Sequence, residues 1–508
     1  MNNSILLPIL LSLGLLVGAT ASANNIQVTN PSLTGNTGTN VKVQFDISWE
    51  NSWRGGGVTN WDAAWVFVKY RSGPAAQWQH LRLSNAGHVA PAGSQIDPGL
   101  VSTALAYNAN SNPVVGAFVY RNAAGNGTFS LSGVQLLVDY AAAGVGYNAL
   151  AEIQVFAIEM VYVPEGPFHF DNSVGTYVQL VVTTDDPTIT ATPAYGYSEW
   201  SGGFPYNGTN PDPDWPNGYG AFYCMKYEVT QQGYVDFLNT LSYTRQSSCT
   251  ATSPNSPTGT GALSPSNANR NGIDIKTPGV ASGTPAVYGC NLNGNGLFLE
   301  ANDGRDIACN WLKWFDLERY LHWSGLRPMT EMEFVKACRG SSFPTFIELA
   351  SGSNEVNTNP YTLANAGTSS EGIATNYSAS VTNVNWSGSN GTINGPMRVG
   401  IFAANGSNSG RITSGASYYG IMEMSGNVHE LVITALTESG RDFNGSHGDG
   451  YYEGGNSTAD TWPGDGGYGV IEVGGSWNSS STQLEVERGS YLVTTDRSSE
   501  YGGRGVRS

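Results

Sequence analysis

The side chains best suited to redox or metal chemistry are spread thinly along this chain. It contains five cysteines and six histidines in 508 residues. No two cysteines form a Cys-x-x-Cys pair, which disfavours a zinc site or a redox motif, and their odd number permits at most two disulfides beside one free thiol. Small thiols in or beside helices are ordinary core residues. We therefore expect the cysteines to have structural roles.

Two helices between residues 307 and 340 are the clearest elements that could position functional groups. The first has apolar residues at the three- and four-residue spacing of a buried face: Trp314, Leu317, Tyr320 and Leu321. Gly325 is expected to end it. The second begins at Thr330, and Glu333 completes a capping box three residues later. Its expected inner edge consists of Met332, Val335 and Cys338.

Five sequence blocks between residues 160 and 507 match the motifs of a known protein family, in the order in which the family has them. They read MVYVPEGPF at 160–168, KYEVT at 226–230, GLRPMTEMEFVKACRG at 325–340, YGIMEMSGNVHE at 419–430, and GGSW at 474–477 with GVR at 505–507. Together they resemble the formylglycine-generating enzyme (sulfatase-modifying factor) family. The resemblance implies a variant of the C-type lectin fold, in which a small twisted antiparallel sheet carries two helices and long irregular loops.

The same resemblance implies copper-dependent oxidation by two cysteines that follow the Gly-Gly-Ser-aromatic motif. Here residues 474–485 read GGSWNSSSTQLE, and no cysteine occurs beyond Cys338. Thiolates are the ligands that Cu(I) prefers, and serine does not replace them. We therefore expect no copper and no formylglycine-generating activity. A related branch uses iron held by a histidine triad, but His80 and His88 lie eight apart outside any helical pattern, so we expect no iron site either.

Calcium is the metal that the resemblance does imply. In the family, the Gly-Asn-Val-x-Glu turn binds a structural Ca²⁺ through side-chain and main-chain oxygens, which are the ligands that this ion takes. The matching residues are Asn427 and Glu430, with Gly426 and Val428 as carbonyl donors. The alternative is that Asn427 only caps a turn. Asn376 is a looser match to a second calcium site of the family.

Composition favours an exported protein rich in strands and turns. Charged residues make up 12% of the chain, about half the usual share, and there are 65 glycines. The net charge of −17 argues against nucleic acid or an anionic membrane as partner, because both require a basic surface. Residues 5–18 are apolar and Ala21-Ser22-Ala23 follows, which predicts a signal peptide cleaved after Ala23 and no membrane span. The mature protein is expected to be periplasmic, secreted or at the cell surface.

Residues 24–157 are expected to form an all-β sandwich ahead of the family domain at 158–508, so the predicted fold class is α+β. Period-two alternation marks strands at 41–49 and 64–70, with further strands at 114–120 and 129–140. Four tryptophans here could line a sugar-binding face, but core packing is the favoured interpretation: Trp49, Trp53, Trp61 and Trp65. Long loops at 170–220, 247–293 and 351–395 are candidates for binding, and merely decorative or partly disordered loops are the equal alternative.

Our leading functional hypothesis is a non-catalytic, calcium-stabilised scaffold that binds an extracellular protein or glycan or assembles a surface. The same scaffold serves as the variable protein of diversity-generating retroelements, whose diversified residues follow Gly-Gly-Ser-Trp. The corresponding candidate contacts here are Trp477, Asn478, Tyr491, Asp496, Arg497 and Tyr501. The alternative is a metal-dependent oxidoreductase with relocated ligands such as His322, His429 and Glu430, although a packed or surface His322 beside Leu321 is the simpler reading.

Overall fold

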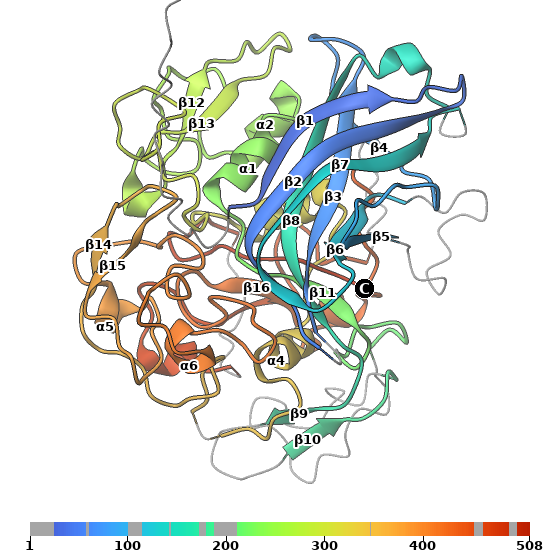
Figure 1. Ribbon diagram of the computed structural model, residues 1–508. Coiled ribbons are helices and arrows are strands. Elements are labelled where there is room, and N and C mark those ends of the chain that lie inside the picture. Colours follow the sequence, from blue (N-terminus) through green and yellow to red (C-terminus); the bar gives the residue numbers. More distant parts are fainter. Residues whose placement is uncertain are drawn as a thin grey trace, which may run out of the picture.

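The computed structural model describes residues 25–56, 60–99, 114–141, 144–171, 179–186, 211–345, 347–451, 461–486 and 495–508. The predicted signal peptide and the candidate contact Tyr491 lie outside these ranges, as does most of the aromatic loop predicted at 170–220. Figure 1 shows the described elements along the chain.

Strands outnumber helices, as the composition predicts. The strands are β1 (Gln27–Thr34), β2 (Asn40–Arg54), β3 (Asp62–Arg71), β4 (Gln79–Leu81), β5 (Ser94–Pro98), β6 (Ala117–Arg121), β7 (Gly125–Asp139), β8 (Glu152–Val163), β9 (Phe168–Asp171), β10 (Gln179–Val182), β11 (Phe222–Met225), β12 (Ile273–Thr277), β13 (Val287–Cys290), β14 (Thr362–Ala364), β15 (Gly372–Thr375), β16 (Glu430–Ile433), β17 (Val470–Val473) and β18 (Val506–Arg507). The α-helices are α1 (Gln231–Leu238), α2 (Tyr243–Cys249), α3 (Trp314–Ser324), α4 (Glu331–Arg339), α5 (Ser387–Asn390), α6 (Arg411–Ser414) and α7 (Glu438–Arg441). No helix of the described residues is long and apolar enough to cross a membrane.

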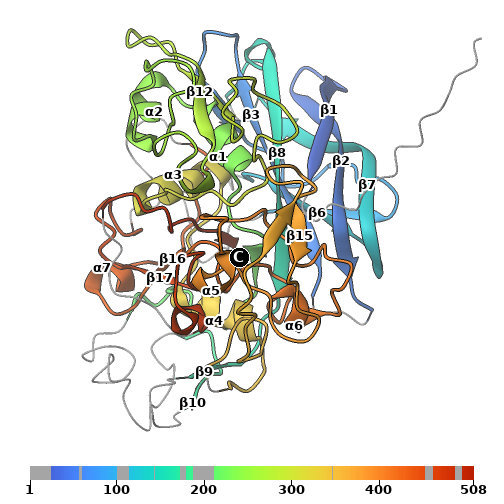
Figure 2. The same cartoon turned by 90° about the vertical axis from the view of Figure 1, so that its left-hand side faces the viewer.

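A seven-stranded antiparallel sheet is the central layer of the molecule. Its order is β18-β11-β8-β3-β6-β5, with β4 pairing β3. A second sheet, β1-β2-β7, covers one face of it, and the helices and long loops cover the other (Figure 2). β3 is buried on both faces, because Val66 and Val68 point into the core shared with the second sheet while Trp65 and Phe67 point toward the helices.

β8 joins the two parts that the sequence predicts as separate domains. It pairs with β3 from Glu152 to Val161 and with β11 from Met160 to Val163. The predicted boundary at 157/158 lies in the middle of this strand. The strands before and after that boundary therefore belong to one sheet, so the N-terminal strands extend the sheet of the C-terminal part.

The two predicted helices form as expected. α3 ends at Gly325, which has the left-handed φ of 72° that glycine adopts readily. Thr330 caps α4: its Oγ1 accepts a hydrogen bond from Glu333 N at 3.2 Å, and Thr330 N donates to Glu333 Oε2 at 3.0 Å. α1 also begins where the second sequence block ends, after the cap residue Thr230. These starts and stops are local, which is why sequence predicts them.

β3 caps the C-terminal end of α3. Trp65 Nε1 donates to Ser324 O at 2.8 Å, and Lys69 Nζ donates to Trp323 O at 2.7 Å. The guanidinium of Arg507 on β18 bonds the carbonyl oxygen of Gly325. The last carbonyls of a helix have no partner within the helix and must find one elsewhere. Three side chains from the central sheet therefore fix α3 against it.

The predicted inner edge of α4 is buried, and so is every other residue of this helix. Its charged groups are satisfied by tertiary partners. Glu333 accepts two bonds from the Arg327 guanidinium, at 2.7 and 2.8 Å. Arg339 Nε donates to Glu348 Oε2 at 2.6 Å, and Lys336 Nζ donates to Tyr219 O at 2.7 Å. A buried charge requires such partners.

All five cysteines are buried and free, so the disulfides that their number permits do not form. The structural role predicted for them agrees with this burial. The core interpretation of the N-terminal tryptophans is confirmed for Trp49 and Trp65, which are fully buried. Trp53 and Trp61 are partly buried and pack against the core that contains Trp65, so these side chains do not form an open sugar-binding face.

Candidate binding site

The structure separates the candidate contacts of the C-terminal stretch into buried and accessible residues. Trp477 is buried and its Nε1 donates to Ser499 O at 2.9 Å, so its placement does not suit a ligand contact. Tyr501 is partly buried, and its carbonyl accepts a hydrogen bond from Leu312 N at 3.2 Å. Asn478 and Asp496 are exposed, whereas Arg497 is partly exposed. Asn478 and Asp496 are thus the most accessible candidates, and Arg497 and Tyr501 are both partly accessible.

A buried polar cluster holds the turn after Gly-Gly-Ser-Trp. Ser479 Oγ accepts a bond from Ser476 N at 2.9 Å and lies 3.2 Å from His429 Nε2. Ser476 Oγ donates to Glu500 Oε2 at 2.5 Å. Burial lowers the pKa of His429, which keeps the ring neutral and able to accept from the Ser479 hydroxyl. Because Ser479 and His429 are buried, we assign them to fixing this turn.

Arg497 lines a pocket of about 590 Å³ together with Trp311 and part of the second long loop. The loop residues that form its wall are Ala251, Thr252, Gly259, Thr260, Gly261, Leu263, Ser264, Pro265 and Ser266. This volume lies within the usual range of small-ligand sites. The pocket therefore joins two regions that the sequence names as binding candidates, the 247–293 loop and the C-terminal stretch.

Trp311 and Arg497 are held in fixed positions at the pocket. Arg497 forms a two-pronged ion pair with Asp316 of α3, in which Nη2 lies 3.0 Å from Oδ1. Trp311 Nε1 donates to Ala268 O at 3.1 Å. The backbone of Trp311 has a φ of 60°, a conformation that is uncommon for a bulky residue and often marks a functional position. Trp311 was not predicted, and this backbone angle has no sequence signature.

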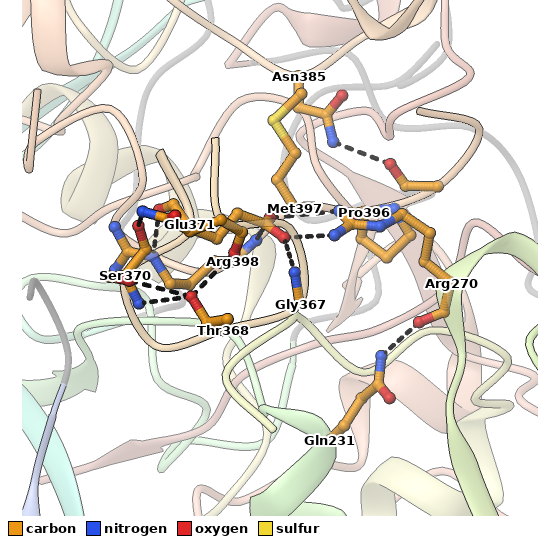
Figure 3. Close-up of polar contacts among 12 residues, drawn as sticks. Gln231, Arg270, Gly367, Thr368, Ser370, Glu371, Asn385, Pro396, Met397 and Arg398 are labelled. Atoms are coloured by element: carbon orange, nitrogen blue, oxygen red, sulfur yellow. Dashed lines mark hydrogen bonds and ion pairs between the residues drawn. The ribbon is translucent and has the colours of Figure 1, made fainter. Parts of the chain in front are cut away.

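A buried ion cluster fastens the pocket loop to the third long loop (Figure 3). The carboxylate of Glu371 pairs with Arg270, which follows the pocket-lining segment, and accepts hydrogen bonds from Gly367 N at 2.7 Å and Arg398 N at 3.0 Å. Gln231 Nε2 donates to Arg270 O at 2.7 Å, which ties the same point to α1. The loop wall is therefore anchored at its C-terminal end.

Most oxygens of the residues predicted to bind calcium are engaged by the protein's own donors, but Glu430 Oε2 is buried without a hydrogen-bond partner among the described residues. Asn427 Oδ1 accepts two hydrogen bonds, from Asn385 Nδ2 at 2.9 Å and from Met397 N at 2.8 Å. Its carbonyl oxygen accepts a bond from Trp477 N at 2.8 Å. Glu430 Oε1 accepts hydrogen bonds from both Nε and Nη2 of Arg504, at 3.0 and 2.7 Å. The guanidinium on this carboxylate opposes a second cation, whereas the free Oε2 is an oxygen that Ca²⁺ could take, so the calcium site stays a prediction.

Chelation tests the calcium prediction directly. We expect excess EGTA to leave the melting temperature within about 1 °C, because the Arg504 guanidinium already neutralises Glu430. The measurement is calorimetric melting of calcium-loaded and chelated protein, with magnesium added as the ionic-strength control. A fall of several degrees on chelation would show that Asn427 and Glu430 rearrange around an ion.

The residues named as relocated metal ligands do not gather into one site. His429 contacts Ser479, whereas Glu430, its neighbour on the chain, faces Arg504. His322 Nδ1 lies 3.4 Å from Asp449 Oδ1. Within the part of the chain that the structure describes, no three His, Cys, Asp or Glu side chains are placed to hold a metal ion.

Comparisons with known proteins identify the family. No curated protein matches this sequence. Among solved structures, PvdO from Pseudomonas aeruginosa is 17% identical with a TM-score of 0.31, and the match covers 69% of this chain and 94% of that chain. Treponema denticola variable protein 1 is 12% identical with a TM-score of 0.30, with coverages of 69% and 95%. The sulfatase-modifying factor enzyme 1-like domain family matches residues 151–508, which begin next to β8, and the chain belongs to this family.

Proposed function

We propose that this protein is an exported, non-catalytic binding protein whose sulfatase-modifying factor domain holds a glycan in the Trp311–Arg497 pocket. The observation that carries the proposal is the pocket itself, formed where the C-terminal stretch meets the 251–266 loop. The absence of any cysteine beyond Cys338 supports a role other than the family's copper chemistry. The apolar segment that precedes Ala23 supports export.

The chemistry of the pocket wall favours a neutral, hydroxyl-rich ligand. Trp311 supplies a flat aromatic surface, and such surfaces pack against the apolar faces of sugar rings. Thr252, Thr260 and Ser266 bring hydroxyl groups to the wall. Thr260 Oγ1 donates to Pro257 O at 2.7 Å and Ser266 Oγ donates to the Asp274 carboxylate, so these two hydroxyls are left to accept hydrogen bonds from a ligand. Among the described lining residues Arg497 alone is charged, and its ion pair with Asp316 offsets that charge. A strongly charged ligand would find no counter-charge there.

Filling the pocket should abolish binding without disturbing the core. Ala251 lines the pocket and is exposed, so Ala251→Trp places a large ring in the ligand volume. We expect its affinity for the best-binding oligosaccharide from a glycan array to fall at least about 10-fold, since occupied volume excludes the ligand. Isothermal titration calorimetry measures the effect, and Ala251→Ser is the matched control.

Two outcomes would contradict the glycan proposal. One is that the purified protein binds no glycan on the array but captures a defined extracellular protein through the same pocket. The other is that Ala251→Trp and Ala251→Ser bind the selected oligosaccharide equally well, which would place the contact elsewhere on the domain.

A further inference from the structure

A second cavity lies where the N-terminal strands meet the family domain, away from the pocket at Trp311. It has a volume of about 460 Å³. Its walls come from the start of β1, from residues 154–159 of β8, from residues 225–236 around the start of α1, and from residues 305 and 306. β1, β8 and α1 lie next to one another in Figure 1. β1 belongs to the second sheet, so the cavity lies where that sheet meets β8 and α1.

The walls of this cavity combine apolar side chains with acidic groups. The apolar part includes Ile26, Val28, Phe156, Ile158, Val229 and Val399. The charged residues that line it are four acids and one base: Glu159, Glu228, Asp236, Asp306 and Arg305. The acids outnumber the base, but burial raises the pKa of all four, to about 7 for Glu159 and to about 6 for Asp236. The exposed Arg305 opposes the rise in the pKa of Asp236 and Asp306 and so favours their charged forms.

The carboxylates of two of the four acids already have partners outside the cavity. Glu159 Oε2 pairs with Lys226 Nζ at 3.0 Å. Glu228 accepts hydrogen bonds from Asn427 Nδ2 at 2.6 Å and Val428 N at 3.0 Å. Asp236, in contrast, accepts only one bond from the described residues, from Gln232 Nε2 at 2.7 Å, and forms no ion pair there. Asp236 and Asp306 are thus the acids left to meet a ligand.

Tyr320 gives an independent indication of a ligand. Its side chain is only 3% exposed, it forms part of the cavity wall, and its hydroxyl makes no hydrogen bond with any described residue. A Cβ added to Gly233, another wall residue, would lie 3.4 Å from this hydroxyl oxygen. A buried tyrosine hydroxyl normally has a partner. Here a molecule inside the cavity would supply it.

We propose that this cavity binds a small organic amine, with its apolar body against β1 and β8 and its ammonium group toward Asp236, Asp306 and Tyr320. An anion would be repelled by the ionised carboxylates. The exposed Arg305 acts on both Asp236 and Asp306, and Arg398 acts on Asp306. An ammonium group would add the direct ion pair that Asp236 lacks among the described residues. A bare metal ion fits less well, because the described residues contain no group of three ligands close enough to hold one. The volume suits a molecule with an aromatic ring and a short amine chain.

Three probes of similar shape but different charge test the proposal: phenethylamine, 2-phenylethanol and 3-phenylpropionate. We expect calorimetry on the full chain to show binding of the amine, at least about 10-fold weaker binding of the alcohol, and no binding of the acid, since only the amine pairs with the acidic wall. Equal binding of amine and alcohol, or no binding of the amine at millimolar concentration, would overturn the proposal.

Variants locate the bound amine. Asp236→Asn keeps the shape of the side chain and should weaken phenethylamine binding at least about 10-fold, whereas Asp465→Asn at an exposed surface position should not change it. Gly233→Leu should abolish binding by filling the space beside Tyr320, and Gly233→Ala should retain it. Melting curves confirm that each variant is folded. Unchanged amine affinity in both Asp236→Asn and Gly233→Leu would place the amine elsewhere and refute the site.

Discussion

Arg504→Met is expected to destabilise the fold by about 3–5 kcal/mol, because it leaves buried carboxylates without their cation. Arg504 is 1% exposed and holds Glu430 through two nitrogens at 2.7 and 3.0 Å. Glu228 and Glu423 are buried beside the same guanidinium and share its charge. Burial raises the pKa of Glu430 to about 7, and Arg504 opposes that rise. Urea unfolding at pH 8 measures the loss.

A surface ion pair provides the matched control for this experiment. Arg71 and Glu152 lie 2.5 Å apart, but their side chains are 23% and 34% exposed. Arg71→Met should therefore cost at most about 1 kcal/mol. The double variant Arg504→Met/Glu430→Leu should recover part of the loss, because it removes the stranded charge as well. Equal effects of Arg504→Met and Arg71→Met would mean that Glu430 is neutralised by something other than Arg504.

Glu331→Gln is expected to stabilise the protein at alkaline pH and to change little in acid. Glu331 is 7% exposed, and its Oε1 accepts hydrogen bonds from Ala435 N and Thr434 Oγ1, both at 2.9 Å. Burial raises its pKa to about 7, from 4.5 for the free side chain. The folded state therefore binds the proton more tightly than the unfolded state. The stability that this group contributes falls as the pH rises from 4.5 through 7.

The prediction concerns the difference in the free energy of unfolding between Glu331→Gln and the wild type. The free energy of unfolding of Glu331→Gln relative to wild type should grow from near zero at pH 4.5 to about 2–3 kcal/mol at pH 8. Denaturant unfolding at several pH values measures the difference, with Glu438→Gln at an exposed position as control. A difference that stays constant with pH, or that grows toward acid, would show that folding does not raise the pKa of Glu331.

The family and the helix ends are what the sequence by itself determined. The blocks at 160–168, 226–230, 325–340, 419–430 and 474–477 predict the family that residues 151–508 match. The Thr330 cap and the Gly325 stop predict the bounds of α3 and α4. The two helix signals depend on interactions within three or four residues, so they can be recognised from the local sequence.

Only the tertiary structure decided which charges, loops and strands meet. The sequence places Glu430 in a calcium turn, yet the fold brings Arg504, 74 positions away, onto its carboxylate. The pocket joins residues 251–266 to Trp311 and Arg497, and β8 joins the N-terminal strands to the family sheet. Such contacts arise from packing between segments far apart in the chain, for which local propensity and periodicity carry no information. For that reason the family could be predicted from the sequence, whereas the two cavities could not.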